Sequence, residues 1–252
     1  MGKFDGILLC TDFDSTLYVN GAISEENFKA IEYFKKNGGL FTIVSGRPDW
    51  MLVDMLGAVR PNTYVCGLNG SVIGMLDGSD KVYESFVEDG LKEYHRIICR
   101  DIPEIKRFHY FTADKMTKVD REDFSDGLIR EHNKNDMYKI TYSVEAEHSN
   151  SVVARISEIL DERYLVTRSS IRGIEMQNAC DCKGAAVKRL ERIVGADTLV
   201  CVGDFENDIS MIESADIGYA VGNACESLKT VADRITVSAE NHALAKIIED
   251  LG

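Results

Sequence analysis

Residues 8–18 read LLCTDFDSTLY, an apolar run that ends in two aspartates. A continuous apolar run of this length is typical of a parallel strand that is buried on both faces. Asp12 and Asp14 stand two residues apart, so both side chains can project to the same side while Phe13 packs inward. Two carboxylates at a strand end repel each other unless they share a cation. Because open parallel sheets bind ligands beyond the carboxyl ends of their strands, we predict a functional site here.

The same pattern recurs toward both ends of the chain. Residues 40–44 (LFTIV) and 198–202 (TLVCV) are apolar runs of strand length. Between the first two runs, Ser24 precedes a segment with apolar residues at helical spacing, which predicts a capped helix. From residue 183 onward, helical and strand patterns alternate. These features predict an α/β fold, in which a parallel sheet is flanked by helices.

The middle of the chain has a different pattern. Residues 88–100 and 151–162 have long polar helical stretches, residues 137–144 alternate in polarity, and residues 164–177 resemble a hairpin. We therefore predict an inserted α+β domain over residues 81–182. The α/β core is then discontinuous and consists of residues 1–80 and 183–252.

Length, composition and charge limit the possible partners. The chain has 252 residues, 44% of them hydrophobic, and a formal charge of −13, which opposes binding to nucleic acid. No run approaches the ~18 apolar residues of a membrane span, and the seven cysteines form no C-x-x-C pair. We expect a cytoplasmic protein with reduced thiols and no membrane partner. The composition leaves monomer and dimer open.

The second predicted strand ends in Ser45, Gly46 and Arg47. A hydroxyl, a glycine that permits close approach and the amides of a following helix can together cradle an anion. An ordinary turn is the alternative interpretation of this segment.

Polar residues also follow the run at 198–202. Asp204 ends that strand, and Asn207 and Asp208 lie at the start of a helix. Carboxylates from two strand ends can converge on a hard cation such as Mg²⁺, whereas the alternative is that Asp204 or Asn207 is a helix N-cap. Lys183 opens another helix, where a cation is unfavourable unless an anion is near. A solvated surface lysine is the alternative for this residue.

Together these segments resemble a known family. D-x-D-x-T at 12–16, S-G-R at 45–47, K-G at 183–184 and G-D-x-x-N-D at 203–208 occur in the order of the four motifs of the haloacid dehalogenase (HAD) superfamily of phosphohydrolases. The long interval before K-G resembles the Cof-type branch, which carries a large α+β cap between motifs two and three. Ser15 departs from the pattern, because many Cof-type members have glycine there.

The resemblance implies a Rossmann-like core, an inserted cap and a set of roles. Asp12 would be the nucleophile that forms an aspartyl-phosphate, and Asp14 the general acid and base. The remaining roles fall into two groups, phosphate or substrate binding by Thr16, Ser45, Gly46, Arg47, Lys183 and Asn207, and Mg²⁺ binding by Asp12, Asp14, Asp204 and Asp208.

The resemblance favours a Mg²⁺-dependent phosphatase of small phosphorylated metabolites, with sugar phosphates as the first class to test. A sugar phosphomutase, which uses the same intermediate, and a non-catalytic phosphometabolite sensor are the alternatives. Arg168 and Arg172 are candidates in the cap for a second anionic group of the substrate, although a solvated hairpin explains them more simply.

Overall fold

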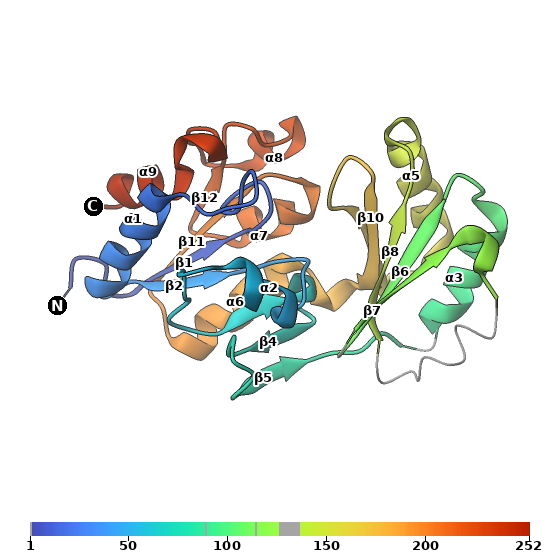
Figure 1. Ribbon diagram of the computed structural model, residues 1–252, viewed down its shortest axis with the longest axis horizontal. Coiled ribbons are helices and arrows are strands. Elements are labelled where there is room, and N and C mark those ends of the chain that lie inside the picture. The colour runs from blue at the N-terminus through green and yellow to red at the C-terminus, as the bar shows by residue number, and fades with distance from the viewer. Residues whose placement is uncertain (1, 89, 114, 126–136) are drawn as a thin grey trace. The chain divides into compact units, whose positions relative to one another are not determined.

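The computed structural model describes residues 2–88, 90–113, 115–125 and 137–252 (Figure 1). The chain forms two compact units. The first, here the core unit, comprises residues 1–84 and 182–252, and the second, the inserted unit, comprises residues 85–181. No helix in the described ranges is long and apolar enough to cross a membrane.

A five-stranded parallel sheet organises the core unit. Its order is β13-β12-β11-β1-β2, and every neighbouring pair is parallel. Cys10 in the central strand lies opposite Cys201 on one side and Thr42 on the other. This sheet confirms the predicted α/β class. Its strands are β1 (Ile7–Thr11), β2 (Leu40–Ile43), β11 (Thr198–Gly203), β12 (Ile217–Ala220) and β13 (Arg234–Ile235).

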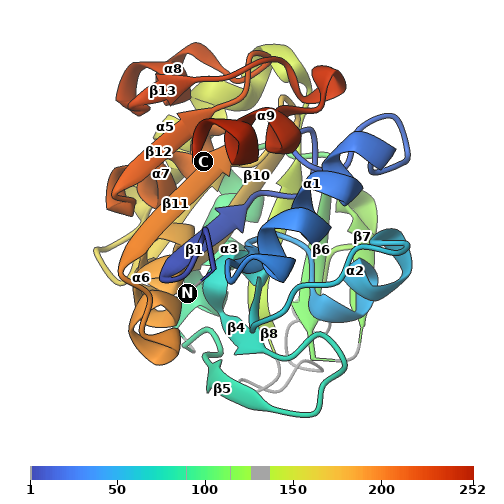
Figure 2. The same ribbon diagram turned by 90° about the vertical axis from the view of Figure 1, so that its left-hand side faces the viewer.

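Helices connect and flank these strands. In the first helix, Ser24 is the N-cap, and its side chain accepts a hydrogen bond of 3.2 Å from the amide of Asn27. The first and last helices pack side by side, although they come from opposite ends of the sequence (blue and red in Figure 2). The helices of this unit are α1 (Glu25–Lys36), α2 (Asp49–Met55), α6 (Lys183–Val194), α7 (Ile209–Ser214), α8 (Glu226–Val231) and α9 (Ala243–Asp250).

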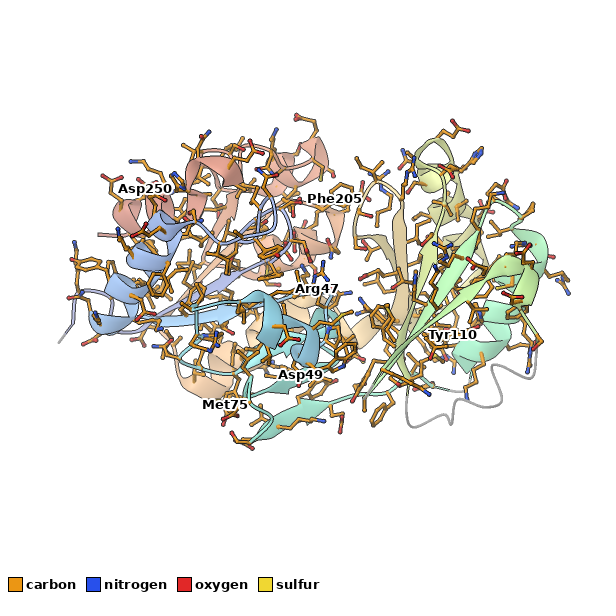
Figure 3. The ribbon with its side chains drawn as sticks, viewed as in Figure 1. Arg47, Asp49, Met75, Tyr110, Phe205 and Asp250 are labelled. Carbon is orange, nitrogen blue, oxygen red and sulfur yellow. The ribbon has the colours of Figure 1, made fainter. Side chains whose placement is uncertain are left out.

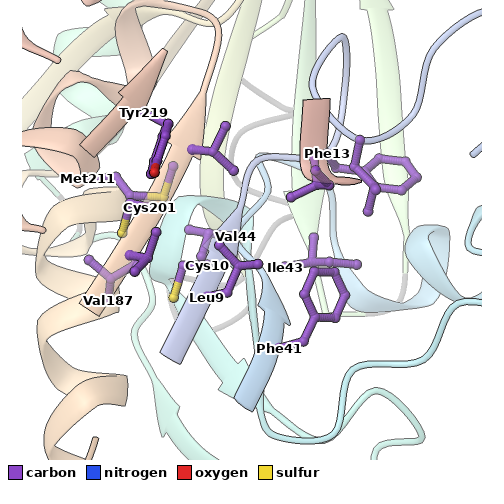
Figure 4. Close-up of a cluster of buried hydrophobic side chains, with 14 of the residues drawn as sticks. Leu9, Cys10, Phe13, Phe41, Ile43, Val44, Val187, Cys201, Met211 and Tyr219 are labelled. Atoms are coloured by element: carbon purple, nitrogen blue, oxygen red, sulfur yellow. The ribbon is translucent and has the colours of Figure 1, made fainter. Parts of the chain in front are cut away.

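Apolar side chains fill the space around the sheet. Figure 4 shows Leu9, Ile43, Val44, Cys201 and Met211 as members of this cluster, and all five are fully buried. The apolar runs of the sequence thus form the centre of the fold because each strand is covered on both faces. Polar residues follow within two positions of the ends of β1, β2 and β11, at Asp12, Ser45 and Asp204.

A small antiparallel sheet lies next to the end of β2. It has the order β3-β4-β5, with β3 (Val65–Gly67), β4 (Val72–Gly74) and β5 (Lys81–Glu84). Between its first two strands, the amide of Leu68 donates to the carbonyl of Arg47 at 3.0 Å, and the amide of Asn69 donates to that of Ser45 at 2.8 Å. These two bonds fix the backbone of the Ser45–Arg47 loop.

The inserted unit is an α+β domain. In its described residues, an antiparallel sheet of order β7-β6-β8-β10-β9 packs with the two helices α3 and α5 around an apolar core. Its elements are α3 (Gly90–Asp101), β6 (Arg107–Thr112), β7 (Met116–Asp120), β8 (Met137–Ser143), α5 (Ser149–Ile159), β9 (Tyr164–Arg168) and β10 (Gly173–Asn178). Strands β9 and β10 form the hairpin predicted over 164–177. Arg172, the last residue of its turn, pairs with Glu145 at 3.3 Å.

A neutral histidine lies inside this unit. His95 on α3 is fully buried, and its two ring nitrogens lie 2.8 Å from the hydroxyls of Tyr142 and Tyr110. Cys99, one turn further along α3, also contacts the ring. Burial, assisted by the charge of Arg96, lowers the pKa of His95 to about 3. The uncharged imidazole is therefore part of the packing of the inserted unit.

This depressed pKa predicts acid sensitivity. In the unfolded chain His95 titrates near pH 6.5, so below that pH the unfolded state binds a proton that the folded state does not. As the pH falls from about 6.5 toward 3, the folded inserted unit should lose about 1.4 kcal/mol of stability per pH unit from this group. Urea unfolding at several pH values, for the wild type and His95→Gln, measures the effect. Equal pH slopes in the two proteins would contradict it.

Candidate active site

Asp12 is the first residue beyond β1. Its amide donates to the carbonyl of Val202 at 2.9 Å, which extends the pairing between β1 and β11 by one residue. The residue is only 6% exposed, and its Oδ1 accepts a hydrogen bond of 2.6 Å from the Nζ of Lys183. The carboxylate is thus held at the carboxyl edge of the sheet.

Lys183 is the buried cation of the site. It begins α6, is 1% exposed and also donates to the Oδ1 of Asp208 at 2.5 Å. Burial alone would lower the pKa of Lys183, but the charges of Asp12 and Asp208 raise it above its ordinary value. The helix reaches this position because Gly184 has no side chain, since a Cβ there would lie 2.3 Å from the carbonyl oxygen of Ser210. The surface-lysine alternative is therefore wrong.

Asp208 connects Lys183 to the loop after β11. While its Oδ1 binds the lysine, its Oδ2 accepts from the amides of Asp204 at 3.0 Å and Phe205 at 3.1 Å. Gly203 leaves room for this carboxylate, because a Cβ there would lie 2.6 Å from the Asp208 side chain. Asp208 thus orients both the cation and the backbone that carries Asp204.

The site has an excess of negative charge. Carboxylate oxygens of Asp12, Asp204 and Asp208 lie within 4.8 Å of one another, against the single charge of Lys183. Burial and the charge of Asp208 raise the pKa of Asp204 to about 7. Burial and Asp208 also raise the pKa of Asp12, although Lys183 opposes the rise. A cluster of hard oxygen donors with this charge fits a divalent cation such as Mg²⁺.

The side chain of Asp14 does not join this cluster, contrary to the simple alternation expected from the sequence. Its two carboxylate oxygens accept hydrogen bonds of 2.7 and 2.8 Å from the guanidinium of Arg47. Arg47 lies between β2 and α2 (Figure 3), and the hydrogen bond to Asp14 is the main cause that raises its pKa. The next residue, Ser15, has φ +60°, so the chain turns sharply after Asp14.

The other predicted residues lie on the same loops. Thr16 donates to the Oδ1 of Asp204 at 3.3 Å, which joins the loops after β1 and β11. The buried hydroxyl of Ser45 accepts from the amide of Arg47 at 3.0 Å, and Gly46 lies between them. Asn207 is partly exposed in the 3₁₀ turn Glu206–Asp208.

The structure also reveals a contact that we did not predict. Asn223, three residues beyond β12, donates from its side-chain amide to the carbonyl of Ser15 at 3.0 Å. The available signal was its position, because Asn223 is a polar residue just beyond the carboxyl end of another parallel strand.

A parallel sheet flanked by helices, with carboxylates and a buried lysine at its carboxyl edge, is the arrangement of an α/β enzyme whose site lies beyond the strand ends. The chain belongs to the haloacid dehalogenase-like hydrolase family, whose model matches residues 9–248. The resemblance seen in the four motifs is thereby confirmed, and the chain is a hydrolase of the Cof-type branch.

Relatives and solved structures agree along nearly the whole chain. The phosphatase YcsE of Bacillus subtilis, named for 5-amino-6-(5-phospho-D-ribitylamino)uracil, is 28% identical over 96% of this chain and 94% of its own. Phosphatase YwpJ of the same species is 24% identical over 97% of this chain and 99% of its own. A sugar phosphatase of HAD subclass IIB shares the fold with a TM-score of 0.77 and 19% identity, covering 97% of this chain and 98% of its own.

The buried lysine predicts a large loss of stability on substitution. Lys183→Met leaves two buried carboxylates without their cation, so the free energy of unfolding at pH 7 in chelator should fall by about 3–5 kcal/mol. Lys188→Met on the same helix is the matched control, because Lys188 forms a partly exposed pair with Glu191 and should matter by at most about 1 kcal/mol. Urea unfolding measures the stability of both variants. Similar losses of stability would contradict the conclusion that the buried Lys183 stabilises the site more than an ordinary lysine of the same helix does.

Proposed function

We propose that this protein is a Mg²⁺-dependent phosphatase of small phosphorylated metabolites, which acts through an aspartyl-phosphate on Asp12. The observation that carries the proposal is the position of the Asp12 carboxylate. It lies at the carboxyl edge of a parallel sheet, with the ammonium of Lys183 at 2.6 Å and Asp204 alongside. The phosphatases to which the chain is similar support the reaction class.

Asp12 is the proposed nucleophile. Its Oδ1 is occupied by Lys183, which leaves the other carboxylate oxygen to attack phosphorus. The bond from phosphorus to this oxygen forms as the bond to the ester oxygen breaks, and the departing alkoxide takes a proton. Water then attacks the phosphorus, loses a proton and releases inorganic phosphate, which restores the Asp12 carboxylate.

Asp14 is proposed to donate the proton that the departing alkoxide takes and to accept the proton that the attacking water loses. In the structure its two oxygens accept hydrogen bonds from Arg47, and a carboxylate held in this way is not positioned to donate a proton. Proton transfer therefore requires the Asp14 side chain to leave the guanidinium. Because this side chain is about half exposed, it has room to move.

The proposed metal ligands are the carboxylates of Asp12 and Asp204 and the backbone carbonyl of Asp14. Asp208 orients Lys183 and the backbone of Asp204 through its hydrogen bonds. When bound, Mg²⁺ supplies positive charge that reduces the repulsion between the phosphate and these carboxylates. Burial, and after it the charge of Asp208, raises the pKa values of Asp12 and Asp204, so negative charge is already unfavourable at this site before a phosphate group binds.

Phosphate binding is proposed for the loops around Asp12. The Ser45 hydroxyl, the Gly46 amide and the Lys183 ammonium offer hydrogen bonds and charge to phosphoryl oxygens, which is what phosphoryl transfer chiefly requires. Thr16 and Asn207 lie on the neighbouring loops and belong to the proposed phosphate-binding set. Arg47 adds a second, partly buried positive charge to this set.

Sugar phosphates are the proposed substrate class. One relative is named as a phosphatase of 5-amino-6-(5-phospho-D-ribitylamino)uracil, and one structural neighbour is named as a sugar phosphatase, which supports this class. We propose that the inserted unit is the cap whose side chains bind the alcohol part of the substrate and set the specificity for it. We also propose a cytoplasmic location, consistent with seven free cysteines, and a monomer or dimer.

Phosphate release from a panel of phosphorylated metabolites tests the function. With Mg²⁺ the wild type should release phosphate from several sugar phosphates, and chelator should abolish the release. Asp12→Asn should lose at least about a thousandfold in kcat, whereas Asp250→Asn, at the exposed end of α9, should not change it. Near-normal turnover by Asp12→Asn would exclude the proposed nucleophile. Turnover only with an added bisphosphate would indicate a phosphomutase instead.

A further inference from the structure

One short segment of the core unit contacts both loops that carry the aspartates. Residues 221–225, here the brace, follow β12. The amide of Cys225 donates to the carbonyl of Asp204 at 2.9 Å, and the side-chain amide of Asn223 donates to the carbonyl of Ser15 at 3.0 Å. The brace therefore links the loop after β1 to the loop after β11.

The residue that Asn223 contacts, Ser15, has an unfavourable backbone conformation. Ser15 has φ +60°, in the left-handed region, where a residue with a side chain is disfavoured relative to glycine. Its amide donates to the carbonyl of Tyr18 at 3.0 Å, while its carbonyl accepts from Asn223. Both polar groups of this peptide segment are thus used to hold a turn that the residue itself does not prefer.

The orientation of the Asn223 amide follows from its neighbours. Its Oδ1 faces the backbone amide of Ala239 at 2.8 Å and the hydroxyl of Ser238 at 3.3 Å. Because a backbone N–H can only donate, the atom that faces Ala239 must be the oxygen. The NH₂ group then faces the Ser15 carbonyl, which can only accept. The side chain is fixed at both ends.

We propose that Asn223 is a positioning residue for Asp14. By holding the Ser15 carbonyl, Asn223 keeps Ser15 in the left-handed conformation and so fixes the backbone from which the Asp14 side chain, one residue earlier, moves between Arg47 and the leaving group. The inference rests on the proposed function, in which Asp14 protonates the leaving group. In this role Asn223 acts through the backbone of Ser15 and not on the substrate.

Asn223→Asp isolates the relevant hydrogen bond. Aspartate has nearly the same shape and still accepts from Ala239 and Ser238, but it has no donor for the Ser15 carbonyl. Ser238→Ala is the matched control, because it removes a hydrogen bond to Asn223 and leaves the bond to Ser15 in place. Ser15→Gly is the rescue background, since glycine adopts the left-handed conformation without support.

The readout is kcat/KM with p-nitrophenyl phosphate and with phenyl phosphate, whose leaving group is less acidic and depends more on protonation. We expect Asn223→Asp to lose about tenfold with phenyl phosphate, part of the 10²–10⁴-fold that general acid catalysis supplies, and clearly less with p-nitrophenyl phosphate. Ser238→Ala should match the wild type. In the Ser15→Gly background the loss should shrink. Thermal unfolding should show that Asn223→Asp remains folded.

The outcomes separate the two proposals. Normal activity of Asn223→Asp, an equal loss on both esters, or a loss that is unchanged in the Ser15→Gly background would overturn the role of Asn223 while the wild type remains a phosphatase. A wild type that hydrolyses neither ester with Mg²⁺ would overturn the proposed function, and the role of Asn223 with it.

Discussion

The buried ammonium of Lys183 lies between the carboxylates of Asp12 and Asp208, and the rest of the site depends on this arrangement. Burying these charges is costly unless they are paired and hydrogen-bonded, and Lys183 with the backbone amides around Asp208 provides those partners. The same contacts bring together the end of β1, the start of α6 and the loop after β11. The site is thus built from segments that are far apart in the sequence.

The positive charge of Lys183 balances only part of the negative charge of this site. Three carboxylates face one ammonium, and burial together with the charge of Asp208 raises the pKa of Asp204 to about 7. A divalent cation would complete the balance, and a phosphate group would add negative charge that Lys183 and the Ser45 loop could take up. The apolar sheet beneath keeps these groups in place because its strands are covered on both faces.

Much of the core fold and of the candidate site could be predicted from the sequence, because apolar runs followed by polar residues mark the ends of buried parallel strands. The apolar runs predicted β1, β2 and β11, and the polar residues that follow them predicted which side chains the structure brings together at the candidate site. Contacts that depend on loop conformation could not be predicted. The pairing of Asp14 with Arg47 depends on how the chain turns at Ser15, and the bond from Asn223 depends on where the loop after β12 returns. Neither leaves a periodic pattern in the sequence.

The most direct test of the account is to trap the covalent intermediate. The protein is mixed with Mg²⁺ and the best substrate of the panel, quenched, and treated with borohydride, which reduces an acyl phosphate to an alcohol. Peptide mass spectrometry should then find homoserine at position 12, and none in Asp12→Asn. Turnover without any reduction at Asp12, or reduction at another aspartate, would contradict the nucleophile on which the account depends.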